Sequence, residues 1–257
     1  MPPLRLEHDG PLAVVTFDSP PLNLFDAEMM SSLANALDEV KGSEARALLL
    51  RADGRVVSAG VDVHLFATLD PDAGADVWRD WFETVHALEE LKIPTVFGAH
   101  GLCLTAAFEI SLACDLLLAG ESAKFGLVEK VVGLTPSMGG PQRLAERAGP
   151  ARARELVYTG ELFDAATLER WNVVNRVLPD EGFDQAARSF AMSLATGPTK
   201  AHAATKAIIR EQIEVGTGAA DEITPEISGR LFGTEDLQNA VASFLKDGPG
   251  KATYTGR

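Results

Sequence analysis

The sequence predicts an α/β fold, in which short buried strands alternate with amphipathic helices. Two apolar runs bounded by turn residues, "LAVVTFD" at 12–18 and "RALLLR" at 46–51, have the length and composition of buried strands. Between them, residues 27–40 repeat apolar side chains at the spacing of a helix. The chain has 257 residues, of which 46% are hydrophobic. This is enough for one large domain with a substantial core.

Further elements are expected along the chain in the same alternation. Strands are predicted at 94–101, 114–120 and 172–179. A helix is predicted at 74–91, because one stripe of it carries Val77, Trp78, Trp81, Phe82, Val85 and Leu88. This stripe indicates a helix that packs on the core, or one whose two Trp and one Phe line an apolar ligand pocket.

The C-terminal part of the chain is expected to be wholly helical. One helix is predicted at 199–214, and Thr234 can cap the start of a last one, which "GPG" ends. One face of this last helix carries Leu237, Val241, Phe244 and Leu245. Such a stripe is expected to pack on its own subunit or on a neighbour. We therefore expect an α/β core with the binding site over 1–197 and a helical region over 198–257.

Charge and cysteine content narrow the class of protein. The formal net charge of −14 disfavours binding to nucleic acid or to an anionic membrane surface. The first ten residues do not have the pattern of a secretory signal, and no apolar run has the length of a membrane helix. Cys103 and Cys114 do not have a metal-binding spacing, so we expect reduced core cysteines. A cytoplasmic protein is expected.

The segment "LCLTAAFEISLACD" at 102–115 holds one carboxylate, Glu109, before its closing Asp. With Thr105 as an N-cap, Glu109 shares a buried helical stripe with Ala106 and Ile110. A charge without a partner is costly to bury, so Glu109 is expected to serve chemistry. The same helix start leaves backbone N–H groups without intrahelical partners, beside the positive end of the helix dipole.

Two other stretches add to this picture. In "AKFGLVEKVVG" at 123–133, Glu129 follows an apolar segment, although it could also be a surface glutamate beside Lys130. Two carboxyls in apolar settings suit general acid–base work on a neutral substrate, because burial raises the pKa of a carboxyl towards neutrality. In "SAGVDVHLF" at 58–66, a small-residue turn is followed by exposed backbone groups at Val61 and Asp62.

Together these stretches resemble the crotonase family of enoyl-CoA hydratases and isomerases. The resemblance covers nearly the whole chain and also includes 19–30, 99–126, 133–149 and the tail 235–257. It implies a crotonase-like spiral of ββα units with a C-terminal helical trimerisation region. It also implies an acyl-CoA thioester substrate, a role in fatty acid metabolism, and a homotrimer or homohexamer.

The resemblance assigns roles to individual residues. It places Glu109 and Glu129 at the positions of the two hydratase glutamates, and the backbone N–H groups of Val61 and Ala106 in the oxyanion hole. A water held between the glutamates would add to C3 of a trans-2-enoyl-CoA, and a proton would be delivered to C2. No metal or further cofactor is implied, since coenzyme A is part of the substrate. The sequence agrees, because it has no GxGxxG, no GxxxxGK and no histidine-rich cluster.

Substrate contacts and one departure also follow from the resemblance. The substrate-binding residues that it implies are Arg55, Val61, Asp62, Val63, His64 and Ala106, with Arg55 and His64 placed to meet the phosphates of CoA. The family usually has two or three glycines where this chain has "TAA" at 105–107. The added methyl groups leave the N–H of Ala106 in place but reduce the room around the thioester.

Other functions remain open on the sequence alone. An enoyl-CoA isomerase would need only the carboxyl of Glu129. A noncatalytic acyl-CoA binder is a second alternative, because of the altered glycines. A serine hydrolase is a third, since Ser137 lies in "PSMGG", although this motif is not GxSxG and no histidine is tied to it.

Overall fold

A six-stranded sheet forms the centre of the protein in our computed structural model, which describes residues 2–257. The first two strands are antiparallel and all later neighbours are parallel. In spatial order the strands are β1 (Leu4–Asp9), β2 (Leu12–Phe17), β3 (Ala47–Ala52), β4 (Thr95–Ala99), β6 (Leu116–Gly120) and β9 (Arg176–Leu178). This arrangement confirms the predicted α/β class and every strand predicted from the sequence.

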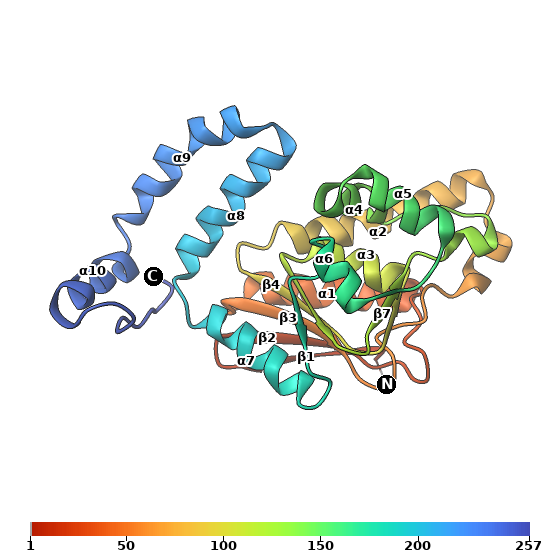
Figure 1. Cartoon of the computed structure of the whole chain (residues 1–257), viewed down its shortest axis with the longest axis horizontal. Coiled ribbons are helices and arrows are strands. Elements are labelled where there is room, and N and C mark those ends of the chain that lie inside the picture. Colours follow the sequence, from red (N-terminus) through yellow and green to blue (C-terminus); the bar gives the residue numbers. More distant parts are fainter. Residues whose placement is uncertain (1) are drawn as a thin grey trace.

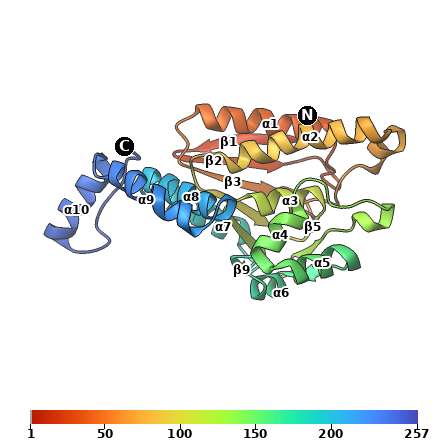
Figure 2. The ribbon, with the colours of Figure 1, turned by 90° about the horizontal axis from the view of Figure 1, so that it is seen from above.

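Helices cover both faces of this sheet (Figures 1 and 2). Helices α1 (Ala27–Gly42) and α2 (Pro71–Glu89) lie over one face, and α7 (Phe183–Ala195) packs against the other. Two clusters of buried apolar side chains therefore form, one on each face of the sheet. Along β3, Leu48 and Leu50 belong to one cluster and Leu49 belongs to the other. Burial on both faces explains why the central strands are uniformly apolar and do not alternate.

A second sheet, which has three strands, lies next to the start of helix α3 (Ala106–Ala113). It consists of β5 (Leu102–Leu104), β7 (Lys124–Gly126) and β8 (Phe163–Asp164). Helix α3 begins one residue after β5, and all of its residues are buried. The remaining short elements of this part are the 3₁₀ helices η1 (Val63–Thr68) and η2 (Glu129–Val132), and the helices α4 (Gly140–Ala148), α5 (Pro150–Thr159) and α6 (Ala165–Arg170).

The C-terminal helices extend away from the sheets (Figure 1). They are α8 (Thr199–Glu214), α9 (Thr217–Leu231) and α10 (Glu235–Asp247), and Thr234 caps α10 as predicted. The last residues return towards the core, where the guanidinium of Arg46 donates to the carbonyls of Gly197 and Tyr254. None of the helices in the described residues is long and apolar enough to cross a bilayer.

Two predicted boundaries differ from the structure by three residues or more. Helix α2 begins at Pro71 and not at residue 74, because Asp70 caps it by accepting a hydrogen bond from the N–H of Ala73 and proline is well suited to the first helical turn. Strand β9 is shorter than the predicted 172–179, since Asn172 takes a positive φ of 62° and the chain turns there.

Candidate active site

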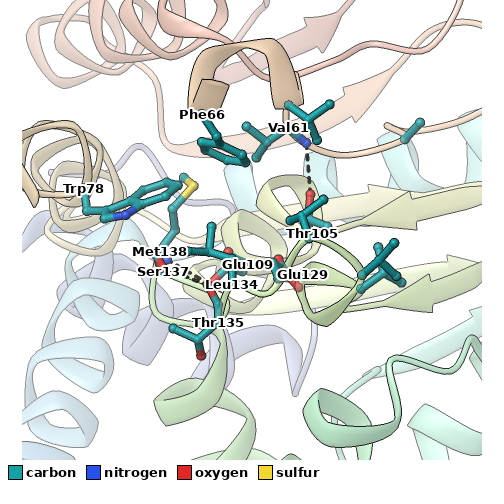
Figure 3. Close-up of a pocket in the computed structure, with 15 residues that line it drawn as sticks. Val61, Phe66, Trp78, Thr105, Glu109, Glu129, Leu134, Thr135, Ser137 and Met138 are labelled. Atoms are coloured by element: carbon teal, nitrogen blue, oxygen red, sulfur yellow. Dashed lines mark hydrogen bonds between the residues drawn. The ribbon is translucent and has the colours of Figure 1, made fainter. Parts of the chain in front are cut away.

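A cavity of about 190 Å³ lies where η1, the start of α3, η2 and the loop before α4 meet (Figure 3). Most of its lining is apolar, and Val63 and Val131 on its border are exposed, so that it opens to solvent. Its polar lining residues are Thr105, Glu109, Glu129, Thr135 and Ser137. The cavity therefore has a mostly apolar lining with a few polar side chains, as ligand sites commonly have.

Glu109 is held at this cavity by backbone groups from another element. Its side chain leaves the buried helix α3, and the residue is only 2% exposed. Its Oε1 accepts hydrogen bonds from the N–H of Met138 at 2.9 Å and from the N–H of Gly140 at 2.8 Å. Gly140 is the first residue of α4, so that the carboxylate also occupies the positive end of that helix.

These surroundings set the protonation of Glu109. Burial raises the pKa of its carboxyl to about 7, against the opposing effects of the two backbone hydrogen bonds and the nearby charge of Arg143. Arg143 itself is paired with Glu89, and its guanidinium also donates to the carbonyl of Gly139. The cation therefore anchors the loop whose N–H groups hold Glu109.

Glu129 supplies the second carboxyl of the cavity. It is the first residue of η2, and its Oε2 is buried without a hydrogen-bond partner among the described residues. Burial, and then the negative charge of Glu109, raise the pKa of Glu129 to about 8. The structure thus brings Glu109 and Glu129 to one site, where the negative charge of Glu109 disfavours ionisation of Glu129.

The backbone around Val61 is fixed by pairing with the segment before α1. Phe25 donates its N–H to the carbonyl of Gly60 and accepts from the N–H of Asp62. Because groups alternate along an extended chain, the N–H of Val61 points the other way. It donates to Oγ1 of Thr105 at 3.1 Å, as the dashed line in Figure 3 shows.

This contact corrects the expected role of Thr105. The residue stands at the N-cap position of α3, but its side chain makes no capping hydrogen bond. Its backbone has a positive φ of 45°, which directs the hydroxyl towards Val61 and away from the first turn of the helix. Ala106, the predicted second oxyanion donor, is fully buried and is not among the residues that line the cavity.

Only some of the predicted substrate-binding residues line the cavity. Val61 and Val63 line it. Asp62 instead caps η1, where its carboxylate accepts from the N–H of His64 at 3.0 Å. Arg55 and His64 are exposed and lie outside the lining of the cavity.

The aromatic stripe of α2 contributes one side chain to the site. Trp78 lines the cavity beside Phe66, with ring centroids 5.7 Å apart. Trp81 is instead buried in the core, and Phe82 packs on His86 outside the lining. The stripe is therefore split between the two interpretations, because Trp81 packs in the core while Trp78 alone of the two Trp and one Phe lines the cavity.

Several wall residues could not be singled out in the sequence. Phe66 closes the "SAGVDVHLF" stretch, but its direction depends on how η1 folds over α2. Leu134 and Met138 come from a loop without any periodic pattern. Ser137 lines the cavity too, with its hydroxyl donating to the carbonyl of Thr135 at 2.8 Å. No histidine is among the cavity-lining residues of 2–257, so the site does not have the arrangement of a serine hydrolase.

Comparisons with known proteins show the family to which the chain belongs. The family model for enoyl-CoA hydratase/isomerase matches residues 7–255. The short-chain-enoyl-CoA hydratase of Clostridium acetobutylicum is 27% identical over 244 residues, which is 94% of each chain. A Mycobacterium tuberculosis protein named "Probable enoyl-CoA hydratase echA8" is 29% identical over 246 residues, or 95% of each chain.

Solved structures give the same result for the fold. A Geobacillus kaustophilus structure named "Enoyl-CoA hydrates" superposes with a TM-score of 0.95 at 25% identity, covering 100% of this chain and 98% of the other. The enoyl-CoA hydratase of Bacillus anthracis superposes with a TM-score of 0.92 at 24% identity, covering 99% and 100% of the two chains. The chain therefore belongs to the enoyl-CoA hydratase/isomerase family and has the crotonase fold.

Proposed function

We propose that this protein hydrates trans-2-enoyl-CoA thioesters to 3-hydroxyacyl-CoA thioesters. The observation that carries the proposal is the pair of carboxyls, Glu109 and Glu129, at one largely apolar cavity. Burial raises the pKa of both carboxyls to about 7 and about 8. General acid–base catalysts work best when their pKa lies near the working pH.

The different surroundings of the two carboxyls suggest different roles. Glu109 accepts two backbone hydrogen bonds, which favour its ionised form. As a carboxylate it would take a proton from water while the water oxygen bonds to C3. Glu129 has an oxygen without a partner and the higher pKa, so its protonated form would deliver a proton to C2. Transfer of the proton from Glu109 back to Glu129 restores the site.

The thioester oxygen gains negative charge when water adds to C3, and the site must stabilise that charge. Val61 and Ala106 are the proposed sources of backbone N–H groups for it. Ala106 is the first residue of α3, where N–H groups have no partner within the helix. One such donor is typically worth about 10²- to 10³-fold in rate. The reaction needs no cofactor besides the coenzyme A of the substrate.

Substitution of each carboxyl tests the proposal. Glu109→Gln and Glu129→Gln should each lower the hydration of crotonyl-CoA by about 10²- to 10⁴-fold, and calorimetry should show that butyryl-CoA still binds. Glu121→Gln is the matched control, because Glu121 is exposed and lies outside the cavity. Wild-type hydration by Glu109→Gln would exclude the mechanism with two carboxyls.

The main alternative function is an enoyl-CoA isomerase, which moves one proton between C2 and C4 through Glu129 alone. It would interconvert 3-enoyl-CoA and 2-enoyl-CoA, and it would tolerate Glu109→Gln. A noncatalytic acyl-CoA binder would bind butyryl-CoA but turn over no enoyl-CoA of any chain length. The presence of Glu109 in the cavity favours hydration over both.

A further inference from the structure

The N–H of Val61 is engaged within the protein, although the proposed function needs a donor at this place. It donates to Oγ1 of Thr105 at 3.1 Å. A thioester oxygen cannot take that N–H while the threonine hydroxyl holds it. Thr105 lines the cavity and is itself only 7% exposed, and Val61 lines it too, so that this hydrogen bond lies at the cavity wall.

The hydroxyl still has a proton to give. A threonine hydroxyl is one donor and two acceptor positions. Its oxygen accepts from Val61, and no acceptor for its own proton is found among residues 2–257. Because Thr105 borders the cavity, that proton can be satisfied by a ligand oxygen there. A hydroxyl that accepts one hydrogen bond becomes a better donor for the next.

The surrounding backbone is shaped for this contact. Thr105 has a positive φ of 45°, a region that a β-branched residue rarely enters. It is fixed there by its own N–H, which donates to the carbonyl of Gly126, and by the pairing of the preceding strand β5 with β7. Opposite it, a Cβ added to Gly60 would lie 2.5 Å from Oγ1 of Thr105. Only glycine at position 60 leaves room for the hydroxyl.

We propose that the hydroxyl of Thr105, held by the N–H of Val61, is the group that donates a hydrogen bond to the thioester oxygen of the substrate. This inference rests on the proposed function, and it replaces one of its two backbone donors with a side chain. The hydrogen bonds then run from Val61 N–H to Thr105 Oγ1, and from that hydroxyl to the thioester oxygen. No covalent bond forms at Thr105.

Three substitutions test whether the hydroxyl of Thr105 donates to the thioester oxygen or only blocks the N–H of Val61. Thr105→Ser keeps the hydroxyl and should retain most of the wild-type kcat. Thr105→Val keeps the shape but removes the donor, and should lower kcat for crotonyl-CoA by about 10²- to 10³-fold with little change in KM. Thr105→Gly should fall between them, because it frees the N–H of Val61 to reach the substrate directly.

A second readout does not depend on hydration. Acetoacetyl-CoA absorbs in the near ultraviolet as its enolate, so a bound donor at the thioester oxygen should change its spectrum. Wild type, Thr105→Ser and Glu109→Gln should give this change, whereas Thr105→Val should bind acetoacetyl-CoA without it. Thermal unfolding of all variants checks that each is folded.

The outcomes keep the two proposals apart. If Thr105→Val keeps the wild-type kcat and spectrum, or if Thr105→Gly exceeds wild type, the hydroxyl is no donor and the inference about Thr105 is wrong, while hydration stands. If the wild-type protein neither hydrates an enoyl-CoA nor changes the spectrum of acetoacetyl-CoA, the proposed function fails, and the role of Thr105 fails with it.

Discussion

The two cavity carboxyls have different surroundings, and the two roles that we propose for them follow from this difference. Glu109 keeps two backbone N–H donors on one oxygen, while Glu129 has an oxygen with no partner. The charge of Glu109 further raises the pKa of Glu129. Because each charge disfavours the other, the pair is expected to lose its two protons in separate steps.

This separation predicts a bell-shaped pH profile. The proposed hydration requires Glu109 ionised and Glu129 protonated, and their pKa values are raised to about 7 and about 8. We expect kcat/KM for crotonyl-CoA to fall below pH 7 and again above pH 8. Steady-state assays that extend below pH 7 and above pH 8 measure both limbs of this profile. Activity that stays constant across both limits would contradict the assigned roles.

The free energy of unfolding should also depend on pH through the carboxyl of Glu129. The pKa of Glu129 is raised from 4.5 to about 8 in the folded protein. Between these values the folded state binds a proton that the unfolded state has lost, so the free energy of unfolding falls as pH rises through the window. Glu129→Gln removes this dependence and should stabilise the protein at pH 8 by roughly 2–4 kcal/mol.

Urea titrations of wild type and Glu129→Gln at several pH values measure this difference. Well below pH 4.5, where the folded and unfolded carboxyls are both largely protonated, the two proteins should differ little. A variant that is less stable than wild type at pH 8 would contradict the proposed burial cost of this carboxyl.

The sequence alone predicts that these two carboxyls belong to the site. It does not predict the hydrogen bond between Thr105 and Val61. Glu109 and Glu129 stand out because they interrupt apolar segments. The hydrogen bond from Val61 to Thr105 joins residues 44 positions apart. It depends on a positive φ at a threonine, and sequence propensity predicts the opposite. The local pattern therefore predicts an ordinary helix cap.

At the scale of elements, the site depends on the junction of α3 with α4. The carboxylate of Glu109 takes the place of an N-cap for α4, since Gly139 at that position has no side chain to offer. Arg143, one turn into α4, fastens the same loop to Glu89 of α2. A change in this junction should thus move Glu109 without touching the substrate.

Gly140→Ala tests that dependence. The added Cβ would lie 2.9 Å from Oε1 of Glu109 and 3.0 Å from Cδ1 of Leu127, so that the carboxylate must shift. We expect a loss of kcat of about tenfold or more, measured as hydration of crotonyl-CoA. Gly42→Ala at the end of α1 is the control, because its Cβ would have no atom within 4 Å. Equal activity of both variants would contradict the positioning role.

Elements were predictable where burial gives a clear pattern. The central strands are apolar because both faces of the sheet are covered. Strand β1 at the edge of the sheet was not predicted, since most of its side chains are exposed or half-buried polar groups. The strands of the second sheet have two or three residues each. Such short strands follow from tertiary pairing and leave no periodic signal.

On the scale of the whole molecule, the C-terminal helices leave apolar surface uncovered. Within one chain, Phe244 and Leu245 of α10 are 59% and 79% exposed, and Val241 is 50% exposed. With Leu237 and the tail residue Tyr254, they border a second cavity of about 300 Å³. A contiguous apolar face of this kind indicates a contact with another protein surface.

We therefore predict that the protein is a trimer or hexamer assembled through this region. Leu245→Glu, and truncation before Thr234, should each reduce the mass measured by light scattering to that of smaller species, and should lower activity if a neighbouring subunit completes the pocket. Asn239→Glu is the control on the exposed polar side of α10. A wild-type protein that is monomeric and fully active at micromolar concentration would contradict this prediction.

The central claim is that the two carboxyls add water across a conjugated enoyl thioester. The most direct measurement is mass spectrometry of crotonyl-CoA after incubation with the protein in oxygen-18-labelled water. We expect a product heavier than the substrate by one molecule of labelled water, formed by wild type and not by Glu109→Gln or Glu129→Gln. A wild-type product with the mass of the substrate, or no product at all, would contradict the account.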